Sequence, residues 1–321
     1  MKNNIIILGG DPNSINSEII YKTWNKVNKK IKRKFCVIAN YNLILAQFKK
    51  LKLKIKITKI KNFNENIKNN NIKIIDVPLN FKDPFNVPLK VSSIYVKKCL
   101  DLANKISLEG KIKGFINCPI DKKLIKTKEI HGVTEYLARK SNVNINSEVM
   151  MLFNRKLSVV PITTHIDIKK ISLNITKNII DKKIKVLNKD FMKIFKRKPK
   201  IAVLGLNPHN GELTKNSEEV KIIIPAIYKL KKDKLNITGP IPADTIFVKD
   251  YKQFDVIIGM YHDQVLIPFK TLFKFNAINI TLGLKYIRVS PDHGTAVKLI
   301  GKNKANYLSL FECVNFIYKL N

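Results

Sequence analysis

Several features that assign proteins to common classes are scarce in this sequence of 321 residues. Its four cysteines, at positions 36, 99, 118 and 313, include no closely spaced pair of the kind that binds zinc. Isolated cysteines are typical of reduced thiols, so we expect a cytoplasmic protein. No apolar run approaches the ~18 residues of a membrane span, and the apolar stretch near the N-terminus is too short for a signal peptide. We therefore expect no membrane partner.

Common signature motifs are also missing. The glycine-rich loops GxGxxG and GxxxxGK[ST] do not occur, so a bound nucleotide cofactor would need an unconventional loop. The motifs HExxH and GxSxG are absent as well, which argues against the zinc proteases and serine hydrolases that carry them.

Acidic residues are few: 24 Asp and Glu stand against 60 Lys and Arg, so the formal net charge is +36. The excess is almost all lysine, spread along the chain among asparagine and isoleucine, as in residues 52–75. Nucleic-acid readers more often use clustered arginine and aromatic side chains, so we interpret the charge as a solvated surface and expect no nucleic-acid partner. A basic nucleic-acid-binding protein is the alternative, and it predicts steeply salt-dependent binding.

Short apolar runs alternate with longer amphipathic segments along the whole chain. This pattern is typical of an α/β protein with a largely parallel sheet, and the length allows two domains. We predict strands at residues 4–8, 34–39, 73–77, 114–117, 148–153, 157–163, 200–205, 255–260 and 277–282. We predict helices at residues 14–31, 88–106, 134–141, 172–195, 217–232 and 306–320.

Three of the five histidines come shortly after predicted strands: His165, His209 and His262. Ligand sites in open α/β sheets lie beyond the carboxyl ends of the strands, so these imidazoles can meet at one place. Three neutral imidazoles with open positions for water or substrate form a catalytic site for a divalent metal such as Zn, Mg or Co. For each histidine the alternative is an ordinary hydrogen-bonding role in a loop. Asp263, next to His262, is a candidate for orienting a metal-bound imidazole.

Cationic and amide side chains follow in the last strands. Lys270, Asn279 and Arg288 combine an ammonium, an amide and a guanidinium, which suit a phosphate or carboxylate. Lys270 could equally be one more surface lysine. Arg288 is harder to assign to the surface, because arginine is scarce here and its neighbours Ile287 and Val289 are apolar.

Two further loops carry candidate groups. The stretch SPDHGTA places Asp292, His293 and Gly294 at the predicted start of a helix, where backbone amides favour phosphate, so we expect them to bind a cofactor. An ordinary helix cap is the alternative for Asp292. Asp244, which follows two prolines in GPIPADTIF, is either a helix cap or a positioned acid.

A series of short motifs resembles that of the 4-hydroxythreonine-4-phosphate dehydrogenase (PdxA) family. The motifs run in the family's order from residue 9 to residue 296: GGDP, TEYLA, TTHI, LNPHNGE, GPIPADTIF, YHDQVLIPFK, NITLGL and DHGTA. The resemblance implies a fold like that of isocitrate and isopropylmalate dehydrogenases, with two α/β lobes and a cleft between them. We expect the lobes to be residues 1–128 with 292–321, and residues 129–291.

The resemblance also implies a reaction and an assembly. The family oxidises the C3 hydroxyl of 4-phosphooxy-L-threonine with NAD, or with NADP, and carbon dioxide is then lost to give 3-amino-2-oxopropyl phosphate, in pyridoxal 5'-phosphate biosynthesis. It implies a homodimer with shared active sites, in which His262 completes the metal site of its neighbour. Alternatives are a metal- and NAD-dependent dehydrogenase of a related hydroxy acid, and a metal-dependent phosphatase or aldolase that needs no NAD.

By motif, the resemblance assigns roles to individual residues. One divalent metal ion would be bound by His165, His209 and His262, and substrate by Thr134, Lys270, Asn279 and Arg288. The general base stays open: the candidates for catalytic groups are Asp244, Asp263 and Lys270.

The sequence departs from the family pattern at three places. Ser14 and Asn16 stand where glycines are usual, which puts close backbone approach to a ligand in doubt. Val133 replaces a substrate-contacting histidine, for which His131 could compensate, and Asp121 replaces another histidine. These changes could retune substrate binding while leaving the three metal histidines in place.

Overall fold

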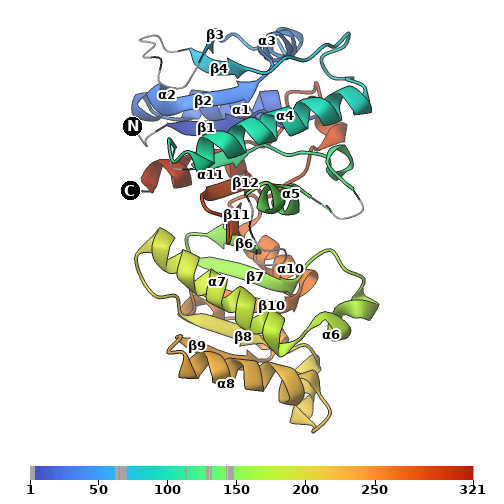
Figure 1. Cartoon of the computed structure of the whole chain (residues 1–321), viewed down its shortest axis with the longest axis vertical. Helices are drawn as coiled ribbons and strands as arrows, with labels where there is room; N and C mark the ends of the chain where they lie inside the picture. The colour runs from blue at the N-terminus through green and yellow to red at the C-terminus, as the bar shows by residue number, and fades with distance from the viewer. Residues whose placement is uncertain are drawn as a thin grey trace. The chain divides into compact units, whose positions relative to one another are not determined.

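The computed structural model describes residues 4–61, 65, 71–112, 114–127, 130, 132–141, 143 and 148–320 (Figure 1). The chain divides into two compact units: unit 1 is Met1–Ile145 with Leu284–Asn321, and unit 2 is Asn146–Gly283. The lobes expected from the sequence change over at residues 128/129 and 291/292. The units therefore differ from the lobes in assigning helix α5 (Val133–Lys140) and strand β12 (Ile287–Pro291) to unit 1.

Unit 1 contains a parallel sheet in the order β3–β4–β2–β1–β5–β12. Its other strands are β1 (Ile5–Leu8), β2 (Phe35–Ala39), β3 (Ile57–Ile60), β4 (Ile72–Asp76) and β5 (Gly114–Asn117). The central strands are apolar on both faces, as expected for parallel strands covered by helices on both sides. The helices are α1 (Asn16–Lys26), α2 (Lys29–Lys34), α3 (Tyr41–Lys50), α4 (Leu89–Leu108), α5 and α11 (Leu308–Lys319).

The core of unit 1 follows from alternation along its strands. Ile6 and Leu8 pack with Val96 and Leu100 of α4, which crosses the face of the sheet that is toward the viewer in Figure 1. Helix α11 contacts β12 and β5 and packs against α1. The sheet thus presents the carboxyl ends of its strands between two helical layers, where ligand sites of this fold class form.

Unit 2 contains a mixed sheet in the order β11–β6–β7–β10–β8–β9. Strand β6 (Val149–Asn154) runs antiparallel to β11 (Ile278–Leu282) and to β7 (Leu157–Thr163). The pairs from β7 through β10 (Val256–Tyr261) and β8 (Ile201–Leu204) to β9 (Ile237–Ile241) are parallel. The helices are α6 (Ile171–Asn174), α7 (Lys177–Phe195), α8 (Ile224–Lys232), α9 (Ala243–Ile246) and α10 (His262–Phe273), and a π-helical turn, η4 (Glu219–Ile223), precedes α8.

The predicted α/β class with largely parallel sheets is confirmed, and each predicted strand is present. Some helices differ from prediction. The segment 14–31 forms two helices, and α2 starts afresh where the Asn28 side chain accepts a hydrogen bond from the Ile31 amide. Helix α7 begins later than predicted, because the Thr176 side chain caps it by accepting from the Ile179 amide. Strands β3, β9 and β12 and helices α3, α9 and α10 were not predicted.

None of the described helices combines the length with the apolar character that a membrane-spanning segment needs.

Candidate active site

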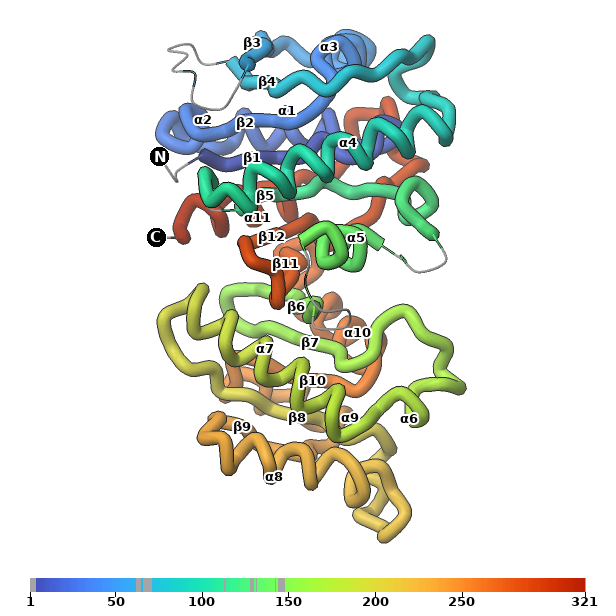
Figure 2. Tube along the Cα trace, in the orientation of Figure 1, coloured from blue at the N-terminus to red at the C-terminus, as the bar shows by residue number. Residues whose placement is uncertain are grey.

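The three histidines predicted to bind metal all lie at one edge of the unit 2 sheet. His165 comes shortly after β7, His262 directly follows β10, and His209 lies in the turn η3 (Pro208–Leu213) after β8. Strand β10 pairs in parallel with β7 on one side and with β8 on the other, so all three strands end at the same edge. Figure 2 traces the chain from β10 directly into α10, which His262 begins.

Two of these imidazoles lie close together within the single chain. The ring centroids of His165 and His262 are 5.9 Å apart, and the rings are tilted by 38°. The two side chains line a cavity of about 200 Å³, together with Thr163, Thr164 and other residues of the β7 and β10 ends. The carboxylate Oδ1 of Asp263 lies 2.6 Å from Nδ1 of His262, which leaves the opposite ring nitrogen for a ligand.

The third histidine stands apart. The side chain of His209 is 72% exposed, and its Nδ1 lies 3.2 Å from Oε1 of Glu212. Among the described residues, no group of three or more His, Cys, Asp and Glu side chains is gathered closely enough to hold a metal ion. One chain therefore brings together His165 and His262 and leaves His209 outside the pair.

A buried carboxylate that the sequence analysis missed holds the turn that carries His209. Glu219 is fully buried, and its Oε1 accepts hydrogen bonds from the amides of Leu206 (2.7 Å) and Asn207 (2.8 Å). Its Oε2 accepts from the Asn207 side chain at 3.0 Å. Burial raises the pKa of Glu219, but the hydrogen bonds outweigh burial and hold the pKa below its ordinary value. The only sequence signal was a pair of acids, Glu218 and Glu219, directly before the largely apolar segment VKIIIPAI.

Gln264, in the first turn of α10, joins the ends of two neighbouring strands. Its Oε1 accepts from the Met260 amide at 2.7 Å, and its Nε2 donates to the Gly205 carbonyl at 2.7 Å. A second side-chain hydrogen bond links β7 to β10: the Thr163 hydroxyl donates to the Met260 carbonyl at 2.7 Å. The three strand ends that precede the histidines are therefore connected by side-chain hydrogen bonds.

Unit 1 holds the predicted arginine in a buried polar site. Arg288 in β12 is 3% exposed. Its Nε donates to Oδ1 of Asn117 at the end of β5, and its Nη1 donates to the hydroxyl of Thr134 in α5 at 3.2 Å. Burial lowers the pKa of Arg288 to about 10, so the guanidinium remains charged at neutral pH. The structure brings Arg288 and Thr134 together and adds Asn117, which the sequence did not single out. Binding of substrate by Arg288 and Thr134 stays a prediction.

The remaining predicted substrate residues lie in unit 2. Oδ1 of Asn279 in β11 is buried without a hydrogen-bond partner among the residues that the structure describes. An acceptor of this kind suits a ligand that carries an N–H or O–H group. Lys270 is exposed on α10, about 12 Å along the helix axis from His262 at 1.5 Å per residue. Asp244 is exposed in the first turn of α9 and is not its cap, because Pro242 occupies that position.

The expectation that Asp292, His293 and Gly294 lie at the start of a helix is wrong. They form a loop that is followed only by a short 3-10 turn at Val297–Leu299, too short to present an aligned set of amides. The loop is held by the amide of Asp292, which donates to the Ser309 hydroxyl at 2.9 Å. Whether the loop binds a cofactor stays a prediction.

The side chains that replace family glycines fill the turn after β1. The Ser14 hydroxyl donates to the Asp11 carbonyl at 2.5 Å, and Nδ2 of Asn16 donates to the Pro119 carbonyl at 2.8 Å. Gly10 has a φ of +73°, and a Cβ there would come within 2.6 Å of the Asn16 side chain. The polar side chains therefore occupy space that glycines would leave open.

The other departures give less information. Val133 begins α5, directly before Thr134, and His131 lies outside the described residues. Asp121 caps a short 3-10 turn by accepting from the Lys123 amide at 2.9 Å. Its own amide donates to Asp11, whose burial raises the pKa of the Asp11 carboxyl.

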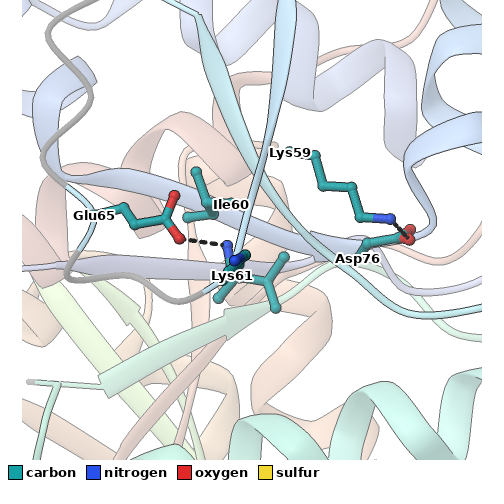
Figure 3. A pocket seen from close by; sticks show the side chains of 6 residues that line it. Lys59, Ile60, Lys61, Glu65 and Asp76 are labelled. Atoms are coloured by element: carbon teal, nitrogen blue, oxygen red, sulfur yellow. Dashed lines mark hydrogen bonds and ion pairs between the residues drawn. The ribbon is translucent and has the colours of Figure 1, made fainter.

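A second depression, of about 590 Å³, lies beside β3 and β4 (Figure 3). Its acidic side chains already have partners: Asp76 pairs with Lys59 at 2.6 Å, and Glu65 accepts from the Lys61 amide at 2.8 Å. None of the predicted site residues is among its lining residues, so it does not compete with the histidine edge as the candidate site.

Comparisons with known proteins decide the family. The family model of the pyridoxal phosphate biosynthetic protein PdxA matches residues 30–317, nearly the whole chain. The chain belongs to the PdxA family. The family resemblance expected from the motifs is thus confirmed, and an oxidoreductase is indicated because the PdxA relatives carry dehydrogenase names.

Individual members of the PdxA family agree along the full length. The 4-hydroxythreonine-4-phosphate dehydrogenase of Sulfurihydrogenibium sp. (strain YO3AOP1) is 41% identical over 314 residues, covering 95% of this chain and 94% of that protein. That of Aquifex aeolicus (strain VF5) is 37% identical and covers 100% of this chain and 99% of its own. The crystal structure of the Klebsiella pneumoniae 4-hydroxythreonine-4-phosphate dehydrogenase superposes with a TM-score of 0.85 at 29% identity, over 98% of both chains.

Proposed function

We propose that this chain is an NAD- or NADP-dependent 4-hydroxythreonine-4-phosphate dehydrogenase. It would oxidise the C3 hydroxyl of 4-phosphooxy-L-threonine, and the resulting β-keto acid would lose carbon dioxide to give 3-amino-2-oxopropyl phosphate. The names of relatives at 37–41% identity support the substrate. The observation that carries the proposal is the placement of His165, His209 and His262 after three adjacent parallel strands.

The edge of the unit 2 sheet that carries the three histidines would provide part of a site for one divalent metal ion within a single chain. His165 and His262 lie side by side at a small cavity, and Asp263 contacts Nδ1 of His262, which would leave Nε2 to bind the metal. His209 would supply the third imidazole, and since one chain does not bring all three together, a homodimer with shared sites would complete the set. The resemblance assigns the imidazole from the second copy to His262, whereas the closeness of His165 and His262 within one chain favours His209 in that role.

The metal and the nicotinamide would carry the redox chemistry, since a bound divalent cation lowers the pKa of an alcohol and the nicotinamide accepts a hydride. The chain's own residues would bind and orient the substrate. Arg288, oriented by Asn117 and Thr134, would hold an anionic group by charge-assisted hydrogen bonds. Oδ1 of Asn279 would accept a hydrogen bond from an amino or hydroxyl group. Lys270 would add a second cation from α10.

The test is NAD reduction, followed at 340 nm, with 4-phosphooxy-L-threonine, combined with metal analysis. We expect the wild-type chain to contain metal and turn over, and His209→Ala to lose both. His293→Ala is a matched control that should keep its metal, because His293 lies in unit 1. If His209→Ala keeps full metal content and rate, the metal assignment is wrong. Turnover only with a related hydroxy acid would favour the alternative dehydrogenase.

A second experiment tests the shared site. His209→Ala and His262→Ala are purified separately, mixed, partly unfolded and refolded together. If each site takes these two histidines from different copies, some mixed dimers carry one intact site, and activity partly returns. If both histidines serve one site within the same chain, no mixture contains an intact site and activity stays absent.

A further inference from the structure

The turn that carries His209 has an unusual backbone. Residues 209–213 all have positive φ, between +48° and +60°, and only Gly211 is a glycine. Residues other than glycine and asparagine rarely adopt this left-handed conformation, and it persists only where the surroundings hold it. Some other part of the molecule must therefore stabilise the position of His209.

The carboxylate of Glu219 contacts the residues at the start of this turn. Both of its carboxylate oxygens accept hydrogen bonds from Leu206 and Asn207, which connect β8 to the turn. Two glycines let the backbone approach the carboxylate: a Cβ on Gly205 would come within 3.0 Å of Oε1, and one on Gly211 within 3.0 Å of Oε2. The carboxylate thus sits between the start of the turn and its centre.

The local helix geometry places Glu219 there. Glu219 begins the π-helical turn η4, which runs into α8. Single π-helical turns are rare and occur often at functional sites. The side chain of Asn210, next to His209, also donates to the Pro240 carbonyl at 3.2 Å, and this bond ties the turn to strand β9.

We propose that Glu219 is a positioning residue for His209, and this inference rests on the proposed function because it assumes that His209 binds the metal. The carboxylate fixes Leu206 and Asn207 through both oxygens, and so holds the turn in the conformation that presents the His209 imidazole. In this role Glu219 acts through the backbone of the turn and not by direct contact with His209 or the substrate.

The test compares Co²⁺ binding by wild type, Glu219→Gln and Glu18→Gln. Glutamine keeps one acceptor oxygen and replaces the other with an NH₂ group, which is itself a donor. The variant therefore loses the hydrogen bonds that one carboxylate oxygen accepts, either from the two backbone amides or from the Asn207 side chain. Glu18 is a matched control in unit 1: it is 1% exposed and accepts from the Ala305 amide at 2.6 Å. We expect Glu219→Gln to bind Co²⁺ about 10- to 100-fold more weakly, as is typical for groups that orient metal ligands, and Glu18→Gln to bind as wild type does.

The amide NMR signals of Leu206 and Asn207 report the hydrogen bonds separately from the metal, and they should move in Glu219→Gln alone. Should that variant fail to fold, Asn207→Ala removes only the side-chain donor, and we expect a smaller weakening of Co²⁺ binding in the same direction. Unchanged affinity in the folded variant of this pair overturns the positioning role. If wild type shows no binding that depends on His209, the metal site of the proposed function fails, and this inference fails with it.

Discussion

The two units of the chain present their candidate groups in opposite ways. In unit 1, Arg288 is buried and hydrogen-bonded to Asn117 and Thr134, so its position is set when the chain folds. In unit 2, His209 is exposed on left-handed backbone, and His262 is 38% exposed at the start of a helix. One chain thus fixes the position of this cation. The histidines are left available for an ion or for a second copy.

This difference has an energetic reason. A buried guanidinium without hydrogen-bond partners would be costly, so it must be satisfied before any ligand arrives. An imidazole that stays in contact with water carries no such penalty, so it can remain exposed until it binds. The comparison predicts that substitution of His209 or His262 acts mainly on metal binding and rate, whereas substitution of the buried Arg288 also affects folding.

The largest effect is expected for His262→Ala in unit 2. Loss of a metal ligand should lower kcat/KM by about 1000-fold, because a bound cation contributes several kcal/mol to the transition state. The melting temperature of the protein without metal should change little, since the side chain is partly exposed. Steady-state kinetics and calorimetry on metal-free protein check both parts. A large loss of thermal stability without metal would contradict the contrast between the units.

Arg288→Lys in unit 1 should lower kcat/KM by about 10- to 100-fold, since a charge-assisted hydrogen bond contributes roughly 1.5–3 kcal/mol. A lysine cannot reproduce the fixed fork that reaches both Asn117 and Thr134. Arg197→Lys is the matched control: Arg197 makes two 2.6 Å bonds to Asp255 at the surface and should leave kinetics unchanged. Equal kinetics for the two variants would remove Arg288 from the substrate site.

Asn279→Ala should raise KM about fivefold, the effect of one neutral hydrogen bond of ~1 kcal/mol, with little change in stability. No bond to its Oδ1 is lost within the described part of the chain. Asn154→Ala offers the reverse pattern, because Asn154 donates to the Asn276 carbonyl at 2.6 Å and accepts from the Lys156 amide. It should lower the free energy of unfolding by ~1 kcal/mol and leave KM alone. If Asn279→Ala instead unfolds early with normal KM, the residue is structural.

The smallest effects concern pH. Burial raises the pKa of Asp255, but Arg197 and the Lys200 amide outweigh burial and lower it overall. Its contribution is therefore present above the unfolded pKa and is lost as pH falls through the lower folded pKa. Asp255→Asn should reduce the free energy of unfolding at pH 7 by about 1 kcal/mol or less, and this difference should shrink below about pH 4.

Asp11 in unit 1 should show the opposite trend. Burial raises its pKa, so its contribution is present below the unfolded pKa and is lost as pH rises through the folded value. Urea unfolding of wild type, Asp255→Asn and Asp11→Asn between pH 3 and pH 7 checks both signs. The same pH trend for both variants would show that the two carboxylates have similar environments.

The sequence predicted those parts of the fold that depend on local pattern. Buried parallel strands such as β1 and β7 are continuous apolar runs, and they lie where predicted. Helix α10 was missed, because its own segment is apolar on several faces and contains Pro268, which usually ends a helix. Strand β9 was missed because Gly239 and Pro240 lie within it.

The candidate site was predicted in part for similar reasons. The histidines were found because strand ends are visible in the sequence and their edge follows from parallel pairing. Asn117 was missed because its partner Arg288 lies 171 residues further along the chain. Glu219 was missed because its role depends on the way the η4 turn folds back onto Leu206 and Asn207, which no local pattern in the sequence shows. The prediction of a helix starting near Asp292 was wrong because the motif SPDHGTA is equally compatible with a loop.

The turn at residues 209–213 also bears on how this chain can evolve. The sequence as a whole is rich in lysine, asparagine and isoleucine. Left-handed backbone accepts asparagine, as at Asn210, but β-branched residues fit it badly. Of the residues that are abundant in this chain, asparagine therefore suits this turn and isoleucine does not. Among relatives of similar composition, we expect asparagine or glycine to recur at these positions and isoleucine to be absent from them.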